Sequence, residues 1–197
     1  MRIGILGISA DPPTDSHLSI ATACIEKKLV DEVWVLPSFN HTQKNNIASF
    51  SQRLYMCKLM FGKWFSPIKV KDYEKYNETG TMFNLLDYLS SKYKYEFFII
   101  VGRDCADNIE TWFKNKELIK TFPFIVFNRG DYSGKNKDWY LSQPHRLIKI
   151  DKCYGSSTLV RKLISRCHYN IASIMSSKKV IRYINNKKLY RGSYENC

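Results

Sequence analysis

The sequence contains no apolar run long enough to cross a membrane, because its strongest one, residues 97–101, has the length of a single strand. It also has no CxxC pair. Its six cysteines are scattered without a matched histidine spacing, which excludes the usual patterns of a zinc site or a disulfide framework. Met1 and Arg2 lead directly into an apolar segment, so we expect no signal peptide. These absences predict a cytoplasmic protein of a reducing compartment with no membrane partner.

Acidic residues are scarce, with 18 Asp and Glu against 31 Lys and Arg, so the formal net charge is +13. Such a charge is typical of nucleic-acid binding or of attraction for polyanionic small molecules, but a Lys- and Asn-rich composition on a solvated surface gives it too. We interpret it as a mixture, in which biased composition supplies most of the charge and a phosphate-binding cleft uses a few of the cations. On this interpretation nucleic acid is not an expected partner.

The chain shows no long linker, no internal repeat and no shift in composition large enough to divide it, which predicts a single domain over residues 1–197. Apolar runs of strand length alternate with segments whose apolar residues recur at helical spacing. That alternation predicts βαβ units with right-handed crossovers. We therefore expect an α/β, Rossmann-like fold with a central, mostly parallel sheet, helices on both faces and a small helical C-terminal part from about residue 156.

Polar motifs follow several of the predicted strands at the points where these strands end. They lie at residues 7–17, at Lys44, at residues 102–104, at Arg129 and at residues 156–161. The carboxyl ends of parallel strands meet at one edge of a sheet, and ligands of α/β proteins bind there. The motifs therefore predict one shared ligand site.

Residues 1–17, MRIGILGISADPPTDSH, hold the most informative motif. A short apolar strand is broken by Gly7, two prolines stiffen its exit, and Thr14, Asp15 or Ser16 can cap a helix. The N–H groups and the positive end of such a helix form an anion site. Many α/β proteins begin in this way, so the outline alone is unspecific.

The pattern GxSxDPPTxxH of residues 7–17 resembles the (H/T)xxH or HxGH loop of nucleotidylyltransferases. Within them it is most similar to the nicotinamide or nicotinate mononucleotide adenylyltransferases. Thr14 stands at the first motif position and His17 at the second. Two residues depart from the family pattern, namely Ile8 in place of a glycine and Ala10 in place of a phenylalanine. A branched residue does not easily adopt a positive φ, and we expect the Ile8 side chain to face any ligand.

A second motif, GSSTLVR at residues 155–161, resembles the ISSTxxR motif of the same family. Two hydroxyls and the N–H groups of a helix start can hold phosphate oxygens, and the planar fork of Arg161 suits a phosphate. By itself the segment reads as an ordinary Ser/Thr cap beside a surface arginine. Its pairing with the first motif favours a phosphate site.

Further segments extend the resemblance over nearly the whole chain. Residues 36–56 are similar to the family's LPxxxPPHK…AS…RLxM stretch and keep its lysine as Lys44, although the two prolines and the histidine are absent. Gly102, Asp104 and Trp112 are similar to its GxD…W element, in which the tryptophan would stack on the pyridinium ring. Without the family, a core aromatic is the plainer interpretation of Trp112.

Two single residues also match family positions. Thr81 occupies the position of a threonine that contacts the pyridine, and Arg129 resembles an arginine of the RPG turn, although its proline is missing. After the GxD element we expect one helix that carries Ile109, Trp112 and Phe113.

The resemblance implies an adenylyltransferase that moves AMP from ATP to nicotinamide mononucleotide, nicotinate mononucleotide or both, giving NAD or deamido-NAD and pyrophosphate. It implies Mg²⁺ carried in by ATP and no metal held by the protein alone, in keeping with the absence of a carboxylate cluster. The acceptor phosphate is already an anion, so His17 is interpreted as a hydrogen-bond donor to a phosphate rather than as a base.

The catalytic residues implied are His17, Lys44 and Arg161. Those implied for ATP binding are Gly7, Ser9, Thr14, His17, Gly102, Asp104, Ser156, Ser157, Thr158 and Arg161, and those for the pyridine nucleotide are Ile8, Ser9, Ala10, Lys44, Thr81, Trp112 and Arg129.

Three alternatives remain open. The acceptor can be another phosphorylated compound, such as phosphopantetheine or glycerol phosphate, although Trp112 speaks against it. A basic nucleic-acid-binding protein on a retained nucleotide-binding fold would also explain the charge. A degenerate, non-catalytic relative is the third, motivated by Ile8 and Ala10. The preference for amide or acid is undetermined, and a homo-oligomer is compatible with the sequence.

Overall fold

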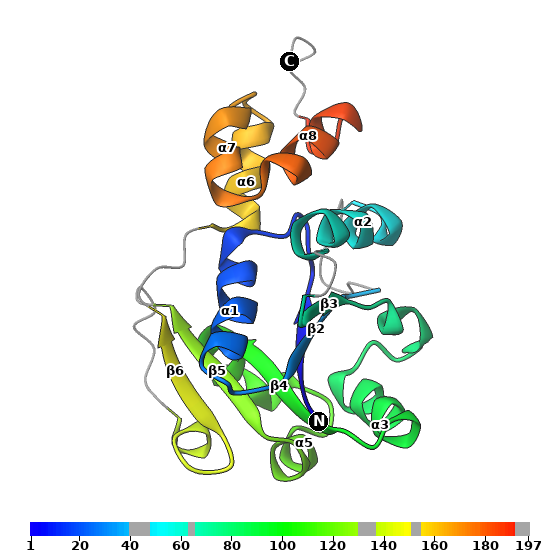
Figure 1. Ribbon diagram of the computed structural model, residues 1–197, viewed down its shortest axis with the longest axis vertical. Coiled ribbons are helices and arrows are strands. Elements are labelled where there is room, and N and C mark those ends of the chain that lie inside the picture. The colour runs from blue at the N-terminus through cyan, green and yellow to red at the C-terminus, as the bar shows by residue number, and fades with distance from the viewer. Residues whose placement is uncertain (40–47, 63–65, 130–136, 151–154, 192–197) are drawn as a thin grey trace.

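The computed structural model describes residues 1–39, 48–62, 66–129, 137–150 and 155–191 (Figure 1). The strands are β1 (Arg2–Ile8), β2 (Glu32–Pro37), β3 (Ile68–Val70), β4 (Glu96–Gly102), β5 (Phe124–Arg129) and β6 (Arg146–Ile150). The α-helices are α1 (Asp15–Glu26), α2 (Phe50–Phe61), α3 (Met82–Lys92), α4 (Arg103–Asp107), α5 (Asn115–Thr121), α6 (Ser157–Ile164), α7 (Tyr169–Met175) and α8 (Lys178–Asn186). Short 3-10 turns occur at Tyr73–Tyr76, Ile109–Thr111 and Asp138–Tyr140.

The strands form a single 6-stranded sheet in the order β3-β2-β1-β4-β5-β6. Every neighbouring pair in it is parallel. The chain begins in the middle of the sheet, winds outward to β3, returns to β4 beside β1 and then winds outward to β6. The expected α/β fold with a parallel sheet is confirmed.

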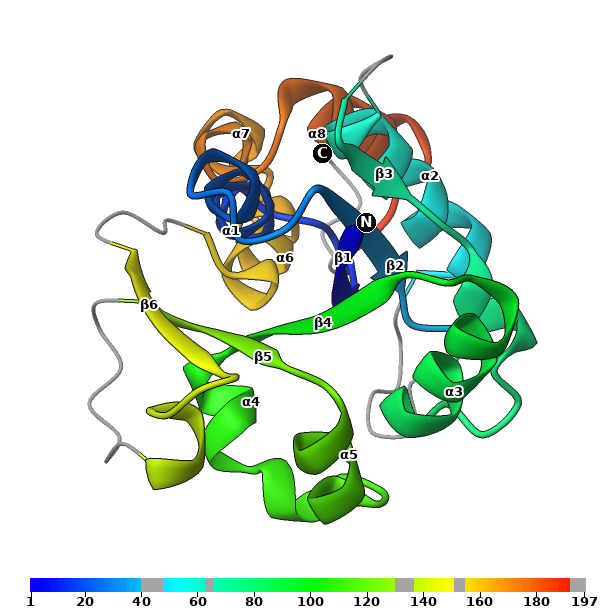
Figure 2. The ribbon, with the colours of Figure 1, turned by 60° about the horizontal axis from the view of Figure 1, so that its bottom comes forward.

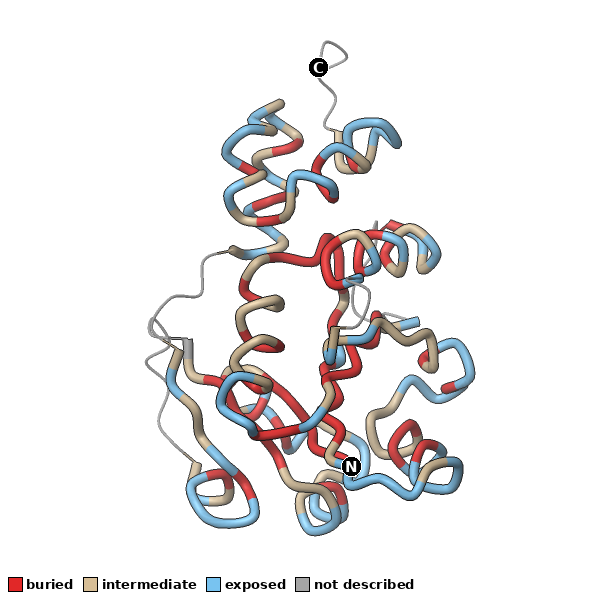
Figure 3. Tube along the Cα trace, viewed as in Figure 1, coloured by how far each residue is buried: buried red, intermediate tan, exposed pale blue. Residues whose placement is uncertain are grey.

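Strand side chains alternate between two apolar layers, since successive residues of a strand point to opposite faces. On one face Leu6, Val35 and Ile100 pack with α1 and α2. On the other face Ile5 and Ile99 pack with α3, α4 and α5. The central strands β1, β2 and β4 are accordingly buried along most of their length (Figure 3), and helices cover both faces as expected.

The helices α6, α7 and α8 lie together beyond the carboxyl ends of the strands, next to α2 and to the start of α1 (Figures 1 and 2). Their buried residues Ile164, Ala172 and Ile184 belong to the same apolar cluster as α1 and α2. The expected C-terminal helices begin with Ser156 as the N-cap of α6. The sequence pattern does not predict α7, because its apolar residues do not lie on one face: Ala172 is buried, whereas Ile171 and Ile174 are exposed.

The prediction of a single helix that carries Ile109, Trp112 and Phe113 is wrong. The chain breaks there into α4, a 3-10 turn and α5. The Asn108 side chain donates to the carbonyl four residues earlier over 2.8 Å, which competes with continuation of the helix. Lys114 then takes a left-handed φ of 51°. Trp112 consequently lies in the turn between the two short helices.

Cys24 and Cys57 are buried free thiols, and burial raises the pKa of each to about 12. Cys167 takes part in a disulfide bond. None of the helices in the described ranges is long and apolar enough to cross a membrane.

Candidate active site

The two central strands separate before they end. The pairing of β1 with β4 stops at Ile5 and Ile99, whereas β1 stays paired with β2 as far as Ile8, and β4 stays paired with β5 as far as Gly102. The last residues of both strands therefore diverge at the point where the strand order reverses. In open parallel sheets this is the place where ligands bind.

Gly7 lies in β1 beside that opening. It is exposed although both of its chain neighbours are buried. A Cβ built on it would come within 3.2 Å of the terminal methyl of Met82, the first residue of α3. The missing side chain thus keeps space open at the centre of the sheet edge.

The loop after β1 corrects the expectation for Ile8 and Ala10. Ile8 ends the strand with its side chain 7% exposed in the core that α1 covers, so the expectation that this side chain faces a ligand is wrong. The positive φ falls instead on Ala10, at 54°, where the side chain is fully buried. A small residue suits that conformation because it has no branched Cβ. The peptide bond between Asp11 and Pro12 is cis.

Thr14 and His17 form a reciprocal pair at the start of α1. Thr14 is the N-cap, and its backbone N–H donates to Nδ1 of His17 over 3.0 Å. The Thr14 hydroxyl lies 2.9 Å from the same nitrogen. A backbone N–H can only donate, so Nδ1 is the acceptor and the neutral imidazole carries its proton on Nε2. The ring is thus fixed in the form that donates a hydrogen bond from Nε2.

Three consecutive carbonyl groups of the loop receive donors from the C-terminal helices. The Arg161 guanidinium donates to the Asp11 carbonyl over 2.6 Å, and the Ser157 hydroxyl donates to that of Pro12 over 2.9 Å. The buried Ser176 hydroxyl donates to that of Pro13 over 2.8 Å. The two motifs that the sequence places at opposite ends of the chain are therefore in direct contact.

The Asp11 side chain ties these segments together. It is 1% exposed, and its Oδ1 accepts from the backbone N–H of Ala48 and from the hydroxyl of Tyr190. Its Oδ2 lies 3.5 Å from the guanidinium of Arg161. Burial, together with the hydrogen bond to Asp11, raises the pKa of Tyr190. The sequence motif gave Asp11 no role, because none of its three partners is near it in the chain.

Arg53 is a second residue whose role the sequence did not indicate. Its side chain is 1% exposed and donates to the carbonyls of Ala48, Ser9, Ser38 and Phe39. These carbonyls belong to the segments that leave β1 and β2 and to the start of α2. Burial lowers the pKa of this guanidinium, which still remains charged and fixes the carboxyl ends of both strands.

Of the residues expected around the pyridine ring, Thr81 and Trp112 lie on the face of the sheet opposite to α1. Thr81 is the N-cap of α3, and its hydroxyl accepts from the backbone N–H of Asn84 over 3.4 Å. Trp112 is half-buried and packs against the same apolar cluster as α3. Gly102 caps α4, and Asp104 lies in its first turn. Thr81 and Trp112 lie on the same face of the sheet as the space beside Gly7.

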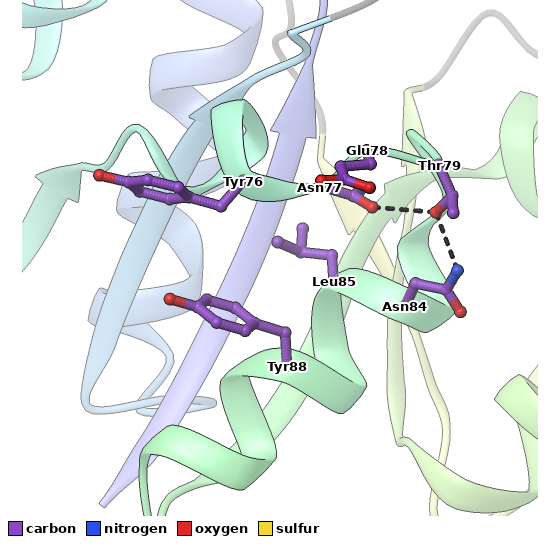
Figure 4. A pocket seen from close by; sticks show the side chains of 7 residues that line it. All are labelled: Tyr76, Asn77, Glu78, Thr79, Asn84, Leu85 and Tyr88. Carbon is purple, nitrogen blue, oxygen red and sulfur yellow. Dashed lines mark hydrogen bonds between the residues drawn. The ribbon is translucent and has the colours of Figure 1, made fainter.

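A hollow of about 200 Å³ lies beside the start of α3 (Figure 4). Figure 4 shows the rings of two tyrosines at one end and polar side chains at the other, where the Thr79 hydroxyl bonds to Asn77 and Asn84. Thr81 adjoins this hollow, because its hydroxyl lies 3.2 Å from that of Thr79 and accepts from the backbone N–H of Asn84. Its lining residues are Tyr76, Asn77, Glu78, Thr79, Asn84, Leu85 and Tyr88.

Some expected residues are not placed. Lys44 lies outside the described residues, and of Arg129 only the backbone, at the end of β5, is described. The Ser156 side chain makes no cap hydrogen bond, whereas the Thr158 hydroxyl accepts from Arg161 over 3.3 Å. In the described part of the chain, no group of three or more His, Cys, Asp or Glu side chains is arranged to hold a metal ion.

Comparisons with known proteins agree with this geometry. Residues 5–163 match a family model described as cytidylyltransferase-like. A probable nicotinate-nucleotide adenylyltransferase of Thermotoga maritima is 32% identical over 136 residues, which cover 68% of this chain and 64% of that protein, just under two thirds of its length. A protein of the same description from Aliarcobacter butzleri is 31% identical over 168 residues, covering 83% of this chain and 88% of the relative.

Solved structures show the same fold. The nicotinic acid mononucleotide adenylyltransferase of Plasmodium falciparum, in complex with NaAD, superposes with a TM-score of 0.84 at 24% identity. The match covers 96% of this chain and 97% of that one. At this identity the likeness concerns the fold alone.

Proposed function

This chain belongs to the nicotinate-nucleotide adenylyltransferase family of cytidylyltransferase-like proteins, and from that premise we propose that it transfers AMP from ATP to nicotinate mononucleotide, releasing pyrophosphate and deamido-NAD. The observation that carries the proposal is the Thr14–His17 pair at the start of α1. It presents a neutral imidazole with a fixed Nε2 donor at a helix N-terminus, where anions are stabilised.

The reaction balances without a general base. One oxygen of the acceptor phosphate attacks the α-phosphorus of ATP, the bond from that phosphorus to the bridging oxygen breaks, and pyrophosphate leaves with the electron pair. The attacking oxygen is already anionic at neutral pH. The protein must therefore position two polyanions and stabilise the charge that develops between them.

His17 and Arg161 supply the donors for that charge. His17 donates from Nε2 to the α-phosphate. Arg161 already bonds to the Asp11 carbonyl and to the Thr158 hydroxyl, but a guanidinium has five N–H groups, so it can hold the loop and bind the triphosphate together. Its side chain is 27% exposed, which leaves it accessible to a ligand. Lys44 is a third proposed donor.

The remaining expected residues are proposed as binding residues. Gly7 and Gly102, at the ends of the two separating strands, admit the nucleotide close to the backbone, and Asp104 accepts from ribose hydroxyls. Thr81 and Trp112 bind the pyridine ring on the opposite face of the sheet from α1. Ser9, Ser156, Ser157, Thr158 and Arg129 complete the proposed set, and Ile8 and Ala10 contribute through their backbone, because their side chains are buried.

Mg²⁺ is proposed to arrive with ATP. Asp11 is the carboxylate of the β1 loop, and it is buried and engaged by Arg161, Ala48 and Tyr190, so it does not suit a metal ligand. The ion would be held by the phosphates, whose negative charge it neutralises when bound.

Two broader expectations stay proposals. Residues 1–197 are proposed to form one domain, because α6, α7 and α8 share an apolar cluster with α1 and α2. A cytoplasmic location stays a prediction from the sequence.

The test is to incubate the protein with ATP and Mg²⁺ and either nicotinate or nicotinamide mononucleotide, and to quantify dinucleotide and pyrophosphate. His17→Asn is the matched variant, since its Oδ1 can still accept from the Thr14 N–H while the Nε2 donor is lost. We expect deamido-NAD to form faster than NAD, and kcat for the variant to fall about 100- to 1000-fold. A protein that binds ATP but joins it to neither acceptor would contradict the proposed substrate. Equal rates for wild type and His17→Asn would contradict the proposed role of His17.

A further inference from the structure

The net charge of the protein is concentrated at one end of the molecule. Residues 155–191 contain nine Lys and Arg and no Asp or Glu. Residues 48–62, which include α2, contain two Lys and Arg and likewise no Asp or Glu. The rest of the chain holds 20 Lys and Arg against all 18 acidic residues. A general compositional bias would not separate the two signs in this way. The α8 helix carries Lys178, Lys179 and Arg182, and it lies beside α2, whose two cations are the exposed Lys58 and the buried Arg53 (Figure 1).

Several of these cations face solvent without a partner among the described residues. Lys178, Lys179, Arg182, Lys187 and Lys188, on and after α8, are exposed, and no ion pair joins them to another described residue. Unlike Arg161, none of them forms a hydrogen bond or ion pair with the described loop of the candidate active site. They form a cationic surface separate from it.

Two tyrosines lie between the helices on this surface. The rings of Tyr55 from α2 and Tyr183 from α8 are 4.8 Å apart between centroids and inclined by 50°. Tyr55 is 48% exposed. Two adjoining open hollows, of about 590 and 340 Å³, share both rings and Asn186. Lys187 lines the first, and Lys179 and Arg182 line the second.

We propose that the groove between α2 and α8 binds single-stranded nucleic acid. Exposed aromatic rings on which bases stack, flanked by cations that contact the backbone phosphates, are the features that bind single strands without sequence preference. Amide side chains such as Asn186 and Gln52, which lines the first hollow, can hydrogen-bond base edges. We thus propose for this surface a partner that the composition did not lead us to expect.

An anionic membrane is the competing occupant of a basic helix. A helix that lies on a bilayer inserts its apolar side chains among the lipids. In α8 these residues, Val180, Ile181 and Ile184, are buried in the core of the protein and are not available to lipid. The charge and the exposed rings therefore favour nucleic acid over a membrane.

The test measures fluorescence anisotropy of a labelled oligo(dT) or oligo(U) of about 12 nucleotides with the full chain, at increasing salt and with saturating ATP to occupy the active site. Contacts from Lys179, Arg182, Lys187 and Lys188 predict a slope of log affinity against log salt of about −3, from about −0.7 for each contact to a single strand. The double variant Lys179→Glu/Arg182→Glu should reduce this slope by half and weaken binding more than 10-fold.

Matched variants keep the test specific. Lys116→Glu/Lys120→Glu makes the same change in net charge at exposed positions of α5, at the other end of the molecule (Figure 1), and should leave binding nearly unchanged. Tyr55→Ala should weaken binding about 5-fold or more, since each base that stacks on an aromatic ring contributes strongly to the affinity. Tyr88→Ala, which removes an exposed ring elsewhere on the protein, should leave binding unchanged. Adenylyl transfer by all these variants should equal that of wild type.

Three results would overturn the proposal. These are equal weakening by the α8 and α5 charge variants, loss of oligonucleotide binding on addition of ATP, and tighter binding to phosphatidylserine vesicles than to the oligonucleotide. The proposal does not depend on the proposed enzymatic activity. An inactive protein that binds the oligonucleotide through α8 would still support it.

Discussion

Tyr190 donates a hydrogen bond from its hydroxyl to Oδ1 of Asp11 over 2.5 Å, which joins two residues 179 positions apart in the chain. Asp11 is almost fully buried, and the same oxygen also accepts from the backbone of Ala48. Because burial and this bond raise the pKa of Tyr190, its hydroxyl stays protonated and remains a donor at physiological pH. The pair therefore fixes the start of the proposed nucleotide loop against the segment that follows α8.

Tyr190→Phe tests that bond. Removing the hydroxyl leaves part of a buried carboxylate unsatisfied, so we expect the free energy of unfolding to fall by about 1–3 kcal/mol. Urea denaturation followed by circular dichroism measures it. Tyr183→Phe is the control, because no hydrogen bond links that hydroxyl to another described residue, and its stability should be unchanged. Similar decreases in the free energy of unfolding for both variants would show that the hydrogen bond to Asp11 does not stabilise the protein.

Arg161→Lys separates charge from geometry. Lysine keeps the positive charge but lacks the planar fork of a guanidinium, so it cannot reproduce the geometry that holds the Asp11 carbonyl and leaves further N–H groups directed at a triphosphate. We expect kcat/KM to fall about 100-fold or more, as for loss of a donor to developing charge. Steady-state kinetics of pyrophosphate release measures the effect. Arg166→Lys, at an exposed position after α6, serves as the control and should retain full activity. An active Arg161→Lys enzyme would rule out a role that needs the guanidinium.

Gly4 and Gly7 lie in the same strand, β1, but a side chain added at Gly4 would meet the core, whereas one added at Gly7 would meet Met82 of α3. Gly7→Ala places a methyl against the flexible end of Met82, so the free energy of unfolding should stay within about 1 kcal/mol of wild type. The methyl also intrudes into the proposed nucleotide space, so KM for ATP should rise. Gly4→Ala would bring its Cβ within 2.5 Å of Ile100 Cδ1 in the core, and we expect it to destabilise by about 1–3 kcal/mol with KM unchanged. Thermal melts and ATP titrations distinguish the two effects, and the reverse pattern would refute the proposed position of the nucleotide.

His145 should make stability depend on pH. Its ring is buried, its Nδ1 accepts from the backbone N–H of Phe124 over 3.2 Å, and burial lowers its pKa. As pH falls below about 6.5, the unfolded chain takes up a proton before the folded protein does, so the free energy of unfolding decreases. In His145→Asn, whose Oδ1 can accept the same bond, this contribution should be absent. Denaturation between pH 7.5 and 5 measures the difference, and parallel curves for the two proteins would contradict it.

The sequence predicted those parts of the site that are local in the chain. Each buried strand is a short run of apolar residues, and Thr14 is one of three neighbouring residues that the pattern offers as the cap of the first helix, so both follow from the local sequence. The orientation of Ile8 could not, because shifting the register of a strand by one residue moves its side chains to the other face. The partners of Asp11 and Arg53 could not be predicted either, since they come from segments that only the folded chain brings together. Contacts between residues that are far apart in the chain leave no pattern in the local sequence.

The three loop carbonyls that bind Ser157, Arg161 and Ser176 also set an order of assembly. Their donors lie 145, 150 and 163 residues downstream, so the loop leaves the ribosome long before the groups that shape it. Contacts of such sequence separation close late in folding. A nascent chain can therefore pair its central strands while its nucleotide loop is still unformed. If the proposed function is correct, adenylyl transfer would therefore begin only after α6 and α7 have docked.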